Sequence, residues 1–327
     1  MPEILFAPME GITGYVFRNA FFRTFGGIAR FYAPFISPAH EEPRITGPSK
    51  RDILPAHNAG TPVVPQLLTN RAEDFLAAAG KLQELGYREV NLNLGCPSGT
   101  VTAKKKGAGF LSETEALRDF LEEVTEHLPA GMRFSVKTRI GWKRADEFPE
   151  LLRIFNGSPI DLLIIHPRVR GEFYRGDVHR DVFADAVRDA RMPLCYNGDL
   201  NRAEDLRQIF ADFPDVHSVM IGRGLLKNPF LAEEFLFRGT QNNPFDEAYR
   251  RKKLLAFHEQ LLGGYLETMD SENAVLCRMK ELWEYLGDNF PEGGREVKAI
   301  RKARDLPQYR DAALILLQNG NLRIGGV

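Results

Sequence analysis

The sequence predicts an α/β protein, a (β/α)8 barrel of the TIM type followed by a small all-α helical bundle. Short apolar runs with the character of β-strands alternate with longer amphipathic runs over residues 4–238. We count eight alternating units, which fit a closed barrel better than an open doubly wound sheet. From residue 245 onward no β-like run is found, and the remaining patterns are helical.

The expected strands are short and follow one another at regular spacing. They cover residues 4–7, 30–33, 63–67, 90–94, 133–138, 162–165, 193–196 and 218–221. The clearest helical patterns between them cover residues 71–85, 113–127, 147–155, 180–190 and 202–210. Ser112 is followed three residues later by Glu115, which is the pattern of a capping box at the start of a helix. Residues 30–60 have little helical pattern, so we expect an additional loop there.

A polar, turn-rich segment at residues 239–244 marks the expected domain boundary, after a short helical pattern at 229–238. We expect residues 1–240 to form the barrel and residues 245–327 to form the helical domain. The helical patterns of the second domain cover residues 246–267, 272–286 and 295–304. Its expected core stripe consists of Met279, Leu282, Trp283 and Leu286.

Charge and cysteine usage limit the classes of function. The chain has 43 basic and 44 acidic residues and a formal charge of -1, so any nucleic-acid surface must be local. Three separated cysteines without a Cys-x-x-Cys pair predict neither a disulfide framework nor a metal site. No apolar run approaches the roughly 18 residues of a membrane span, and the start lacks the cationic segment of a signal peptide. We expect a soluble, cytoplasmic protein without membrane association, and nothing implies a protein partner.

Polar residues gather at the ends of the expected strands, where barrels of this type place their chemistry. These residues are Pro8, Met9, Gln66, Asn93, Cys96, Lys137, Arg139, His166, Asn197, Asp199, Gly222 and Arg223. Lys137 and Arg139 share one face of a strand, and two cations inside a barrel require an anionic or polar ligand. The glycine-bearing turns around Asn197 and Arg223 match the place where barrels commonly hold a phosphate. The sequence therefore predicts a polar, anionic, phosphate-bearing ligand.

The strand at residues 90–94 leads directly into a turn that holds Cys96. Strand alternation places Asn91 and Asn93 on one face, and buried amides require partners. The lysines at 104–106 follow in a glycine-bearing segment, which we expect to be a mobile loop. A thiol, two amides and a basic segment together predict a site, whereas Cys195 and Cys277 are expected to be structural.

Six stretches at these strand ends resemble the FMN-dependent tRNA-dihydrouridine synthases in order and spacing. They read APMEGIT at 7–13, NLNLGCP at 91–97, VKTRIGW at 136–142, HPR at 166–168, NGD at 197–199 and MIGRG at 220–224. Farther on, RMKELWEYL at 278–286 looks like the helical-domain motif of that family. One such motif is a weak signal, but six in register are a strong one.

The resemblance implies an FMN-bearing barrel that NADPH reduces and that transfers a hydride to C6 of a tRNA uridine. It implies that Cys96 protonates C5, and an ordinary thiol, with a pKa of about 8.5, is mostly protonated at neutral pH. By the same resemblance Asn93 and Arg139 meet the uracil edge, and a cation at Lys137 favours the anionic reduced flavin. The implied FMN contacts are Pro8, Met9, Gln66, Lys137, His166, Asn197, Asp199, Gly222 and Arg223.

The implied partner is tRNA, with phosphate contacts from the cationic helix at 295–304 and from the lysines at 104–106. Gly14 stands where the family often has Asp, and Val169 where Thr is common, so the choice of uridine stays open. One alternative is a flavin oxidoreductase of free pyrimidines, of the dihydroorotate dehydrogenase type, which does not need the helical tail. The other is a tRNA-binding barrel without catalytic activity, which binds no flavin.

Overall fold

The computed structural model describes residues 2–38, 47–237 and 245–323. The chain forms two compact units. The first consists of Met1–Glu10, Ala29–Asp199 and Gln208–Ile221, and the second of Gly11–Ile28, Leu200–Arg207 and Gly222–Val327. The expected boundary at residues 239–244 lies outside the described residues.

The first unit is built on nine parallel strands in the order β3-β2-β1-β9-β8-β7-β6-β5-β4. The strands are β1 (Glu3–Phe6), β2 (Arg30–Tyr32), β3 (Val63–Val64), β4 (Gln66–Leu67), β5 (Glu89–Leu94), β6 (Arg133–Arg139), β7 (Leu162–His166), β8 (Leu194–Tyr196) and β9 (Ser218–Ile221). Only Pro65, which has no N–H to donate, separates β3 from β4. The two end strands of the sheet are thus the two halves of one expected strand, and the eight-stranded barrel is confirmed.

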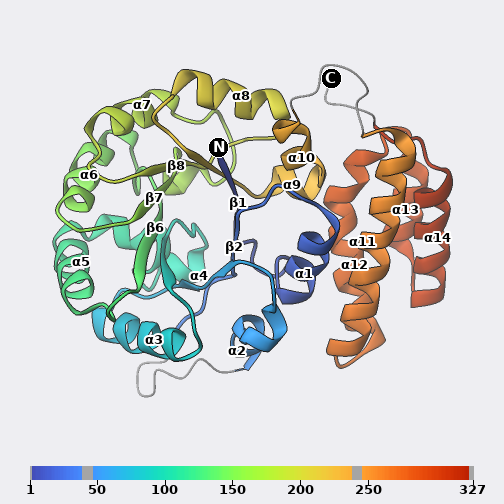
Figure 1. Ribbon diagram of the computed structural model, residues 1–327, viewed down its shortest axis with the longest axis horizontal. Coiled ribbons are helices and arrows are strands. Elements are labelled where there is room, and N and C mark those ends of the chain that lie inside the picture. The colour runs from blue at the N-terminus through green and yellow to red at the C-terminus, as the bar shows by residue number, and fades with distance from the viewer. Residues whose placement is uncertain (1, 39–46, 238–244, 324–327) are drawn as a thin grey trace. The chain divides into compact units, whose positions relative to one another are not determined.

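Helices surround these strands, as α3, α5, α6 and α7 show in Figure 1. The bounds are α2 (Gly47–Ile53), α3 (Ala72–Glu84), α4 (Gly99–Thr102), α5 (Thr114–His127), α6 (Phe148–Asn156), α7 (Arg180–Asp189) and α8 (Ala203–Asp212). The five expected helices are confirmed within one or two residues at most ends. The capping box is wrong: α5 begins after Glu113, and the Ser112 hydroxyl donates to the Gly109 carbonyl instead.

Strand register decides which side chains face the barrel interior. The pairs Gln66 with Asn91 and Asn93 with Lys137 lie side by side, so these four polar side chains share the inner face. Lys137 is in turn beside Ile164, a member of the inner apolar cluster. That cluster contains Leu5, Ala7, Tyr32, Val64, Leu162, Ile164, Cys195 and Met220. Burial raises the pKa of Cys195 to about 12, so this thiol is an inert part of the core, as expected.

The second unit is helical. It contains α1 (Tyr15–Thr24), α9 (Arg223–Lys227), α10 (Leu231–Leu236), α11 (Glu247–Thr268), α12 (Glu272–Leu286), α13 (Gly294–Lys302) and α14 (Leu306–Asn319). Phe257 of α11 packs edge-on against Phe17, Phe21 and Phe25, with ring centroids 5.2 to 5.9 Å apart. The four residues of the expected stripe on α12 are all buried, which confirms it as core. Cys277 on the same helix is exposed.

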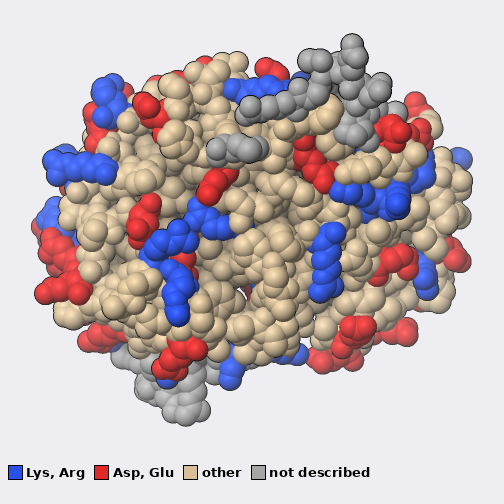
Figure 2. Space-filling model, in the orientation of Figure 1, with Lys and Arg blue, Asp and Glu red and all other residues tan. Residues whose placement is uncertain are grey.

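The surface gives no broad field of one charge on the face that Figure 2 shows, where basic and acidic side chains are interspersed. This agrees with the near-zero formal charge of the whole chain. Within residues 2–38, 47–237 and 245–323, every helix is too short or too polar to cross a bilayer. A search of the same residues finds no cluster of His, Cys, Asp and Glu able to hold a metal ion.

Candidate active site

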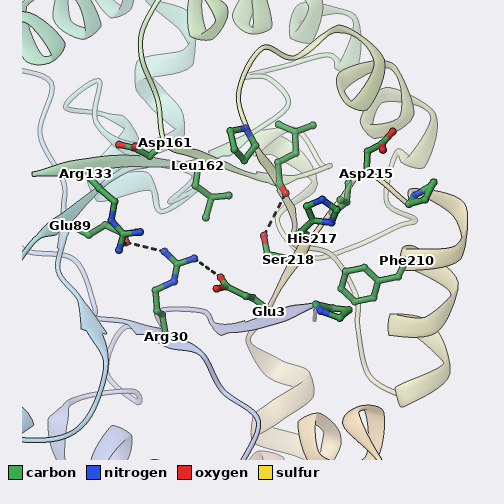
Figure 3. Close-up of a pocket in the computed structure, with 15 residues that line it drawn as sticks. Glu3, Arg30, Glu89, Arg133, Asp161, Leu162, Phe210, Asp215, His217 and Ser218 are labelled. Carbon is green, nitrogen blue, oxygen red and sulfur yellow. Dashed lines mark hydrogen bonds and ion pairs between the residues drawn. The ribbon is translucent and has the colours of Figure 1, made fainter. Parts of the chain in front are cut away.

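A chain of buried polar side chains begins at the floor of the barrel, where the strands start. The Glu89 carboxylate, with a side chain 7% exposed, accepts hydrogen bonds from Arg30 at 2.9 Å and from the Tyr32 hydroxyl at 3.1 Å. Arg133 lies 2.7 Å from the same carboxylate. Figure 3 shows Arg30 reaching both Glu89 and Glu3, so the charges at the floor are paired with one another.

The chain continues through the interior toward the mouth, where the strands end. The Ser135 hydroxyl donates to Glu89 at 3.2 Å and accepts from the Asn91 amide at 2.9 Å. Gln66 donates to Asn91 at 2.7 Å and accepts from Asn93 at 2.8 Å. Every amide therefore has its orientation set by its neighbour, which makes the network rigid.

The network ends on the backbone of the cysteine turn. The Asn93 side-chain oxygen accepts from the backbone N–H groups of Gly95 at 3.0 Å and of Cys96 at 2.9 Å. Asn93, expected at the uracil edge, thus spends its oxygen on holding this turn, and one of its two N–H groups on Gln66. Its position at the mouth fits the expectation, but its observed contacts are those of a positioning residue.

Cys96 is half-buried at the mouth. Burial raises the pKa of its thiol above the ordinary value, and Arg139 and Lys137 offset this only in part. The lysines at 104–106 lie in a turn between α4 (Gly99–Thr102) and a short 3-10 helix at Gly107–Ser112, and the expected mobility of this segment stays a prediction. The Ala108 N–H donates to the Cys96 carbonyl at 3.0 Å. A Cβ on Gly107 would lie 2.9 Å from that carbonyl, so only glycine fits this approach.

Lys137 is the feature that calls most directly for a ligand. Its ammonium group meets no carboxylate or hydrogen-bond acceptor among the described residues. Burial lowers its pKa to about 8, and the neighbouring Arg139 adds to the effect. An unpaired cation inside a barrel costs free energy, which an anionic or electron-rich ligand would offset.

Arg139 is almost fully buried and holds together the loops that follow β5 and β7. Its guanidinium donates to the carbonyls of Gly95 at 2.9 Å, Val169 at 3.1 Å and Phe173 at 2.7 Å. It also lies 5.4 Å from the centre of the Tyr174 ring. These contacts give Arg139 a bracing role that the sequence does not show, and its expected contact with a uracil edge stays a prediction.

His166, Asn197 and Asp199 lie at the ends of neighbouring strands. Arg168 links two of them, since it lies 3.2 Å from the His166 Nε2 and forms an ion pair with Asp199. The Asn197 amide donates to the Met220 carbonyl at 2.8 Å. The sequence analysis missed Arg168 as a site residue, although its place two residues after His166 gives it the same strand-end location.

Tyr174 is the second residue that the sequence analysis missed. Its ring is 50% exposed and stacks on His166 with centroids 5.9 Å apart and an angle of 24°. It follows the strand end by eight positions, so no periodic pattern marks it. Its exposure, its stacking and the nearby Arg139 make it part of the mouth.

The remaining expected site residues divide between the two units. Pro8 and Met9 follow β1 in the first unit and are partly exposed. Gly222 and Arg223 belong to the second unit, where Gly222 precedes α9 and Arg223 is its first residue. Within the first unit the structure brings together the polar residues that follow β4 to β8.

These features define a class: a parallel (β/α)8 barrel whose mouth carries a protonated thiol, an ammonium group without a partner in the described part of the chain, and buried arginines. The old yellow enzyme from Trypanosoma cruzi shares this fold. The two structures have a TM-score of 0.51 over 76% of this chain and 91% of that chain, at 12% identity. At that identity the similarity shows the fold alone.

The sequence comparisons show the family. The family model described as dihydrouridine synthase (Dus) matches residues 5–305, and the chain belongs to this family. The tRNA-dihydrouridine(16) synthase of Pseudomonas syringae pv. tomato is 27% identical over 93% of this chain and 95% of its own. The protein of the same name from Cupriavidus necator is 27% identical over 93% of this chain and 94% of its own.

Proposed function

We propose that this protein is a tRNA-dihydrouridine synthase, which reduces the C5–C6 bond of a uridine in tRNA with FMN as cofactor and NADPH as reductant. The observation that carries the proposal is the pair formed by Lys137, which has no hydrogen-bond partner among the described residues, and the half-buried Cys96, whose raised pKa keeps the thiol protonated, at one barrel mouth. Membership of the dihydrouridine synthase family and the names of the two relatives support it.

The residues present fit FMN. Lys137 offers a cation without a protein partner to the electron-rich pyrimidine part of a flavin. The proposed contacts are Pro8, Met9, Gln66, Lys137, His166, Asn197, Asp199, Gly222 and Arg223. When bound and reduced, FMN supplies the hydride that C6 of the uridine receives. NADPH as the reductant is carried over from the family resemblance.

Cys96 supplies the proton that C5 of the uridine receives. Its raised pKa keeps the thiol protonated at neutral pH, which suits a general acid rather than a thiolate nucleophile. The Asn93 oxygen and the Ala108 N–H fix the backbone on both sides of this thiol. Arg139 holds the adjacent Gly95 carbonyl, so the whole turn is preorganised for the transfer.

A uracil that reaches this mouth has to leave its stack in the RNA, at a cost of a few kcal/mol. We propose that the helical residues 245–327 help to hold the tRNA and so offset this cost. A groove of about 700 Å3 is lined by Lys298, Arg301 and Lys302 of α13, whose charges suit phosphate groups. It is also lined by the carboxylates of Asp288 and of Glu284, which pairs with Arg301 at 2.7 Å. Lys104 offers a further exposed cation, and the exposed Lys105 pairs with Glu113 at 2.6 Å.

The test uses purified protein, an unmodified tRNA transcript, FMN and NADPH, with dihydrouridine counted position by position. We expect bound flavin absorbance and product at one position or a defined set, and position 16 is the first to inspect because the two relatives are named for it. Flavin binding with turnover of a free pyrimidine instead would favour the dihydroorotate dehydrogenase type. Absence of flavin after FMN addition would favour a non-catalytic barrel.

A further inference from the structure

Phe173 is an apolar residue whose side chain is exposed to solvent on the loop that follows β7. Its side chain is 43% exposed, and with Tyr174 it makes two adjacent members of the few large apolar side chains that the described surface exposes. Its φ of +52° is unfavourable for a residue with a bulky side chain. Strained backbone of this kind persists only where the surroundings impose it, and it is concentrated at binding sites.

Hydrogen bonds of the neighbouring residues fix the strained backbone of Phe173. Arg139 donates to the Phe173 carbonyl at 2.7 Å, and the Val169 N–H donates to the Glu172 carboxylate at 2.7 Å. His179 contacts the same carboxylate at 2.7 Å, and the Arg170 N–H donates to the Gly141 carbonyl at 2.9 Å. The loop is therefore ordered, and the exposure of Phe173 is built into it.

Phe173 belongs to a stack of three side chains. The Arg170 guanidinium lies 4.8 Å from the centre of the Trp142 ring and 5.4 Å from that of Phe173. Its one side-chain hydrogen bond to the described protein goes to the Thr102 hydroxyl at 3.2 Å, and its Nε is buried without a partner. Most of its N–H groups are thus unused, and Thr102 connects it to the segment that carries Lys104 and Lys105.

The neighbouring Tyr174 faces the other way, against His166 and Arg139 inside the mouth. Consecutive side chains are thus divided between the inner site and the outer stack of Trp142, Arg170 and Phe173. Phe173 is the exposed ring of this stack, and Trp142 is half-buried. An exposed aromatic ring beside an arginine with unused donors suits an unpaired nucleotide, through stacking and contacts to phosphate or base oxygens.

We propose that the outer stack seats the base of an unpaired tRNA nucleotide directly next to the uridine that is reduced. The proposal rests on the proposed function and adds a specificity-determining surface to it. Stacking of a base on an aromatic ring predicts that loss of the ring weakens tRNA binding about 5- to 150-fold.

The experiment compares Phe173→Ala, Phe173→Leu and Phe173→Trp in the full chain. We expect Phe173→Ala and Phe173→Leu to raise the Kd for an unmodified tRNA transcript at least about fivefold, measured by fluorescence anisotropy. Phe173→Trp should bind like the wild type, because it keeps an aromatic face. NADPH oxidation without tRNA and the Tm should change little in all three, which separates stacking from folding and from flavin chemistry.

A second measurement identifies the nucleotide. Transcripts with one abasic residue at each unpaired position in turn are bound to wild type and to Phe173→Ala. An abasic residue at one position next to the reduced uridine should weaken tRNA binding by the wild type. The same transcript should show no further loss of binding to Phe173→Ala. The proposal is overturned if Phe173→Leu binds like the wild type, if no position couples, or if the coupled position is not adjacent. The anisotropy arm stands even where no uridine is reduced, so failure of the proposed function is distinguished from failure of the stack.

Discussion

The two ends of the barrel are both polar, but among the described residues they differ in how their charges are paired. At the floor, Arg30 and Arg133 meet the carboxylates of Glu3 and Glu89. At the mouth, Arg139 donates to backbone carbonyls and interacts with Tyr174, and Lys137 has no carboxylate partner among the described residues. Removing one partner of a buried ion pair destabilises the fold. A buried charge without a partner costs free energy that a bound ligand can offset, which makes it a candidate for a functional site.

A pocket of about 630 Å3 lies at the floor, lined in part by Glu3, Arg30 and His217 (Figure 3). Conserved chemistry in barrels of this type lies at the opposite end, where strands finish. The charge pattern of this molecule agrees with that rule, and we therefore assign the ion pairs at the floor a role in stability and not in catalysis.

The largest effect is expected at the thiol. Cys96→Ala should keep bound FMN and NADPH oxidation but lower dihydrouridine formation at least about 100-fold, because the proton donor is lost. Cys277→Ala, which removes an exposed thiol from α12, is the matched control and should leave the rate unchanged. Loss of flavin from Cys96→Ala would assign the cysteine a structural role instead.

A smaller effect, on stability alone, is expected at the floor. Glu89→Gln removes the carboxylate that two arginines share, and should lower the free energy of unfolding by about 2 kcal/mol in a urea titration. The cost is below that of a fully buried pair because Arg133 is largely exposed. Glu73→Gln, at an exposed ion pair with Arg71, should change it by less than about 0.5 kcal/mol. An equal loss of unfolding free energy in Glu89→Gln and Glu73→Gln would contradict the stabilising role of the floor ion pairs.

The smallest effect concerns pH. With a pKa of about 8, Lys137 is protonated below pH 8 and neutral above it. An electron-rich ligand prefers the protonated form, so above pH 8 binding takes up a proton and FMN affinity should fall by up to about tenfold per pH unit. Isothermal titration at pH 7, 8 and 9 measures this. In Lys137→Met the affinity should be lower throughout and lack this dependence, and a retained dependence would assign it to another group.

The barrel could be predicted from the sequence because apolar strand patterns recur between amphipathic helices. Two features could not be predicted: the break between β3 and β4 at Pro65, and helix α1. Helix α1 buries Arg18, whose guanidinium donates to the Thr13 carbonyl, and this polar residue interrupts the apolar pattern. Local patterns do not show that such a residue has found an internal partner.

For the site, the sequence predicted which strand ends are polar, and the structure adds what each side chain touches. Gln66 and Asn93 hydrogen-bond to each other across 27 positions, and Arg139 reaches Phe173 across 34. Such contacts depend on strand register and loop conformation, which no local spacing encodes. Tyr174 and the left-handed Phe173 were missed for the same reason.

The most direct test of the difference between the two ends uses one strand. Lys137 and Arg133 lie on the same face of β6, one at the mouth and the other at the floor. FMN affinity is measured by fluorescence titration at pH 7 for wild type, Lys137→Met and Arg133→Met. We predict that Lys137→Met weakens binding at least about tenfold, the scale of one charge-assisted contact, while Arg133→Met binds like the wild type. Unchanged affinity in Lys137→Met, or an equal loss in Arg133→Met, would contradict the assignment of the cofactor site to the mouth.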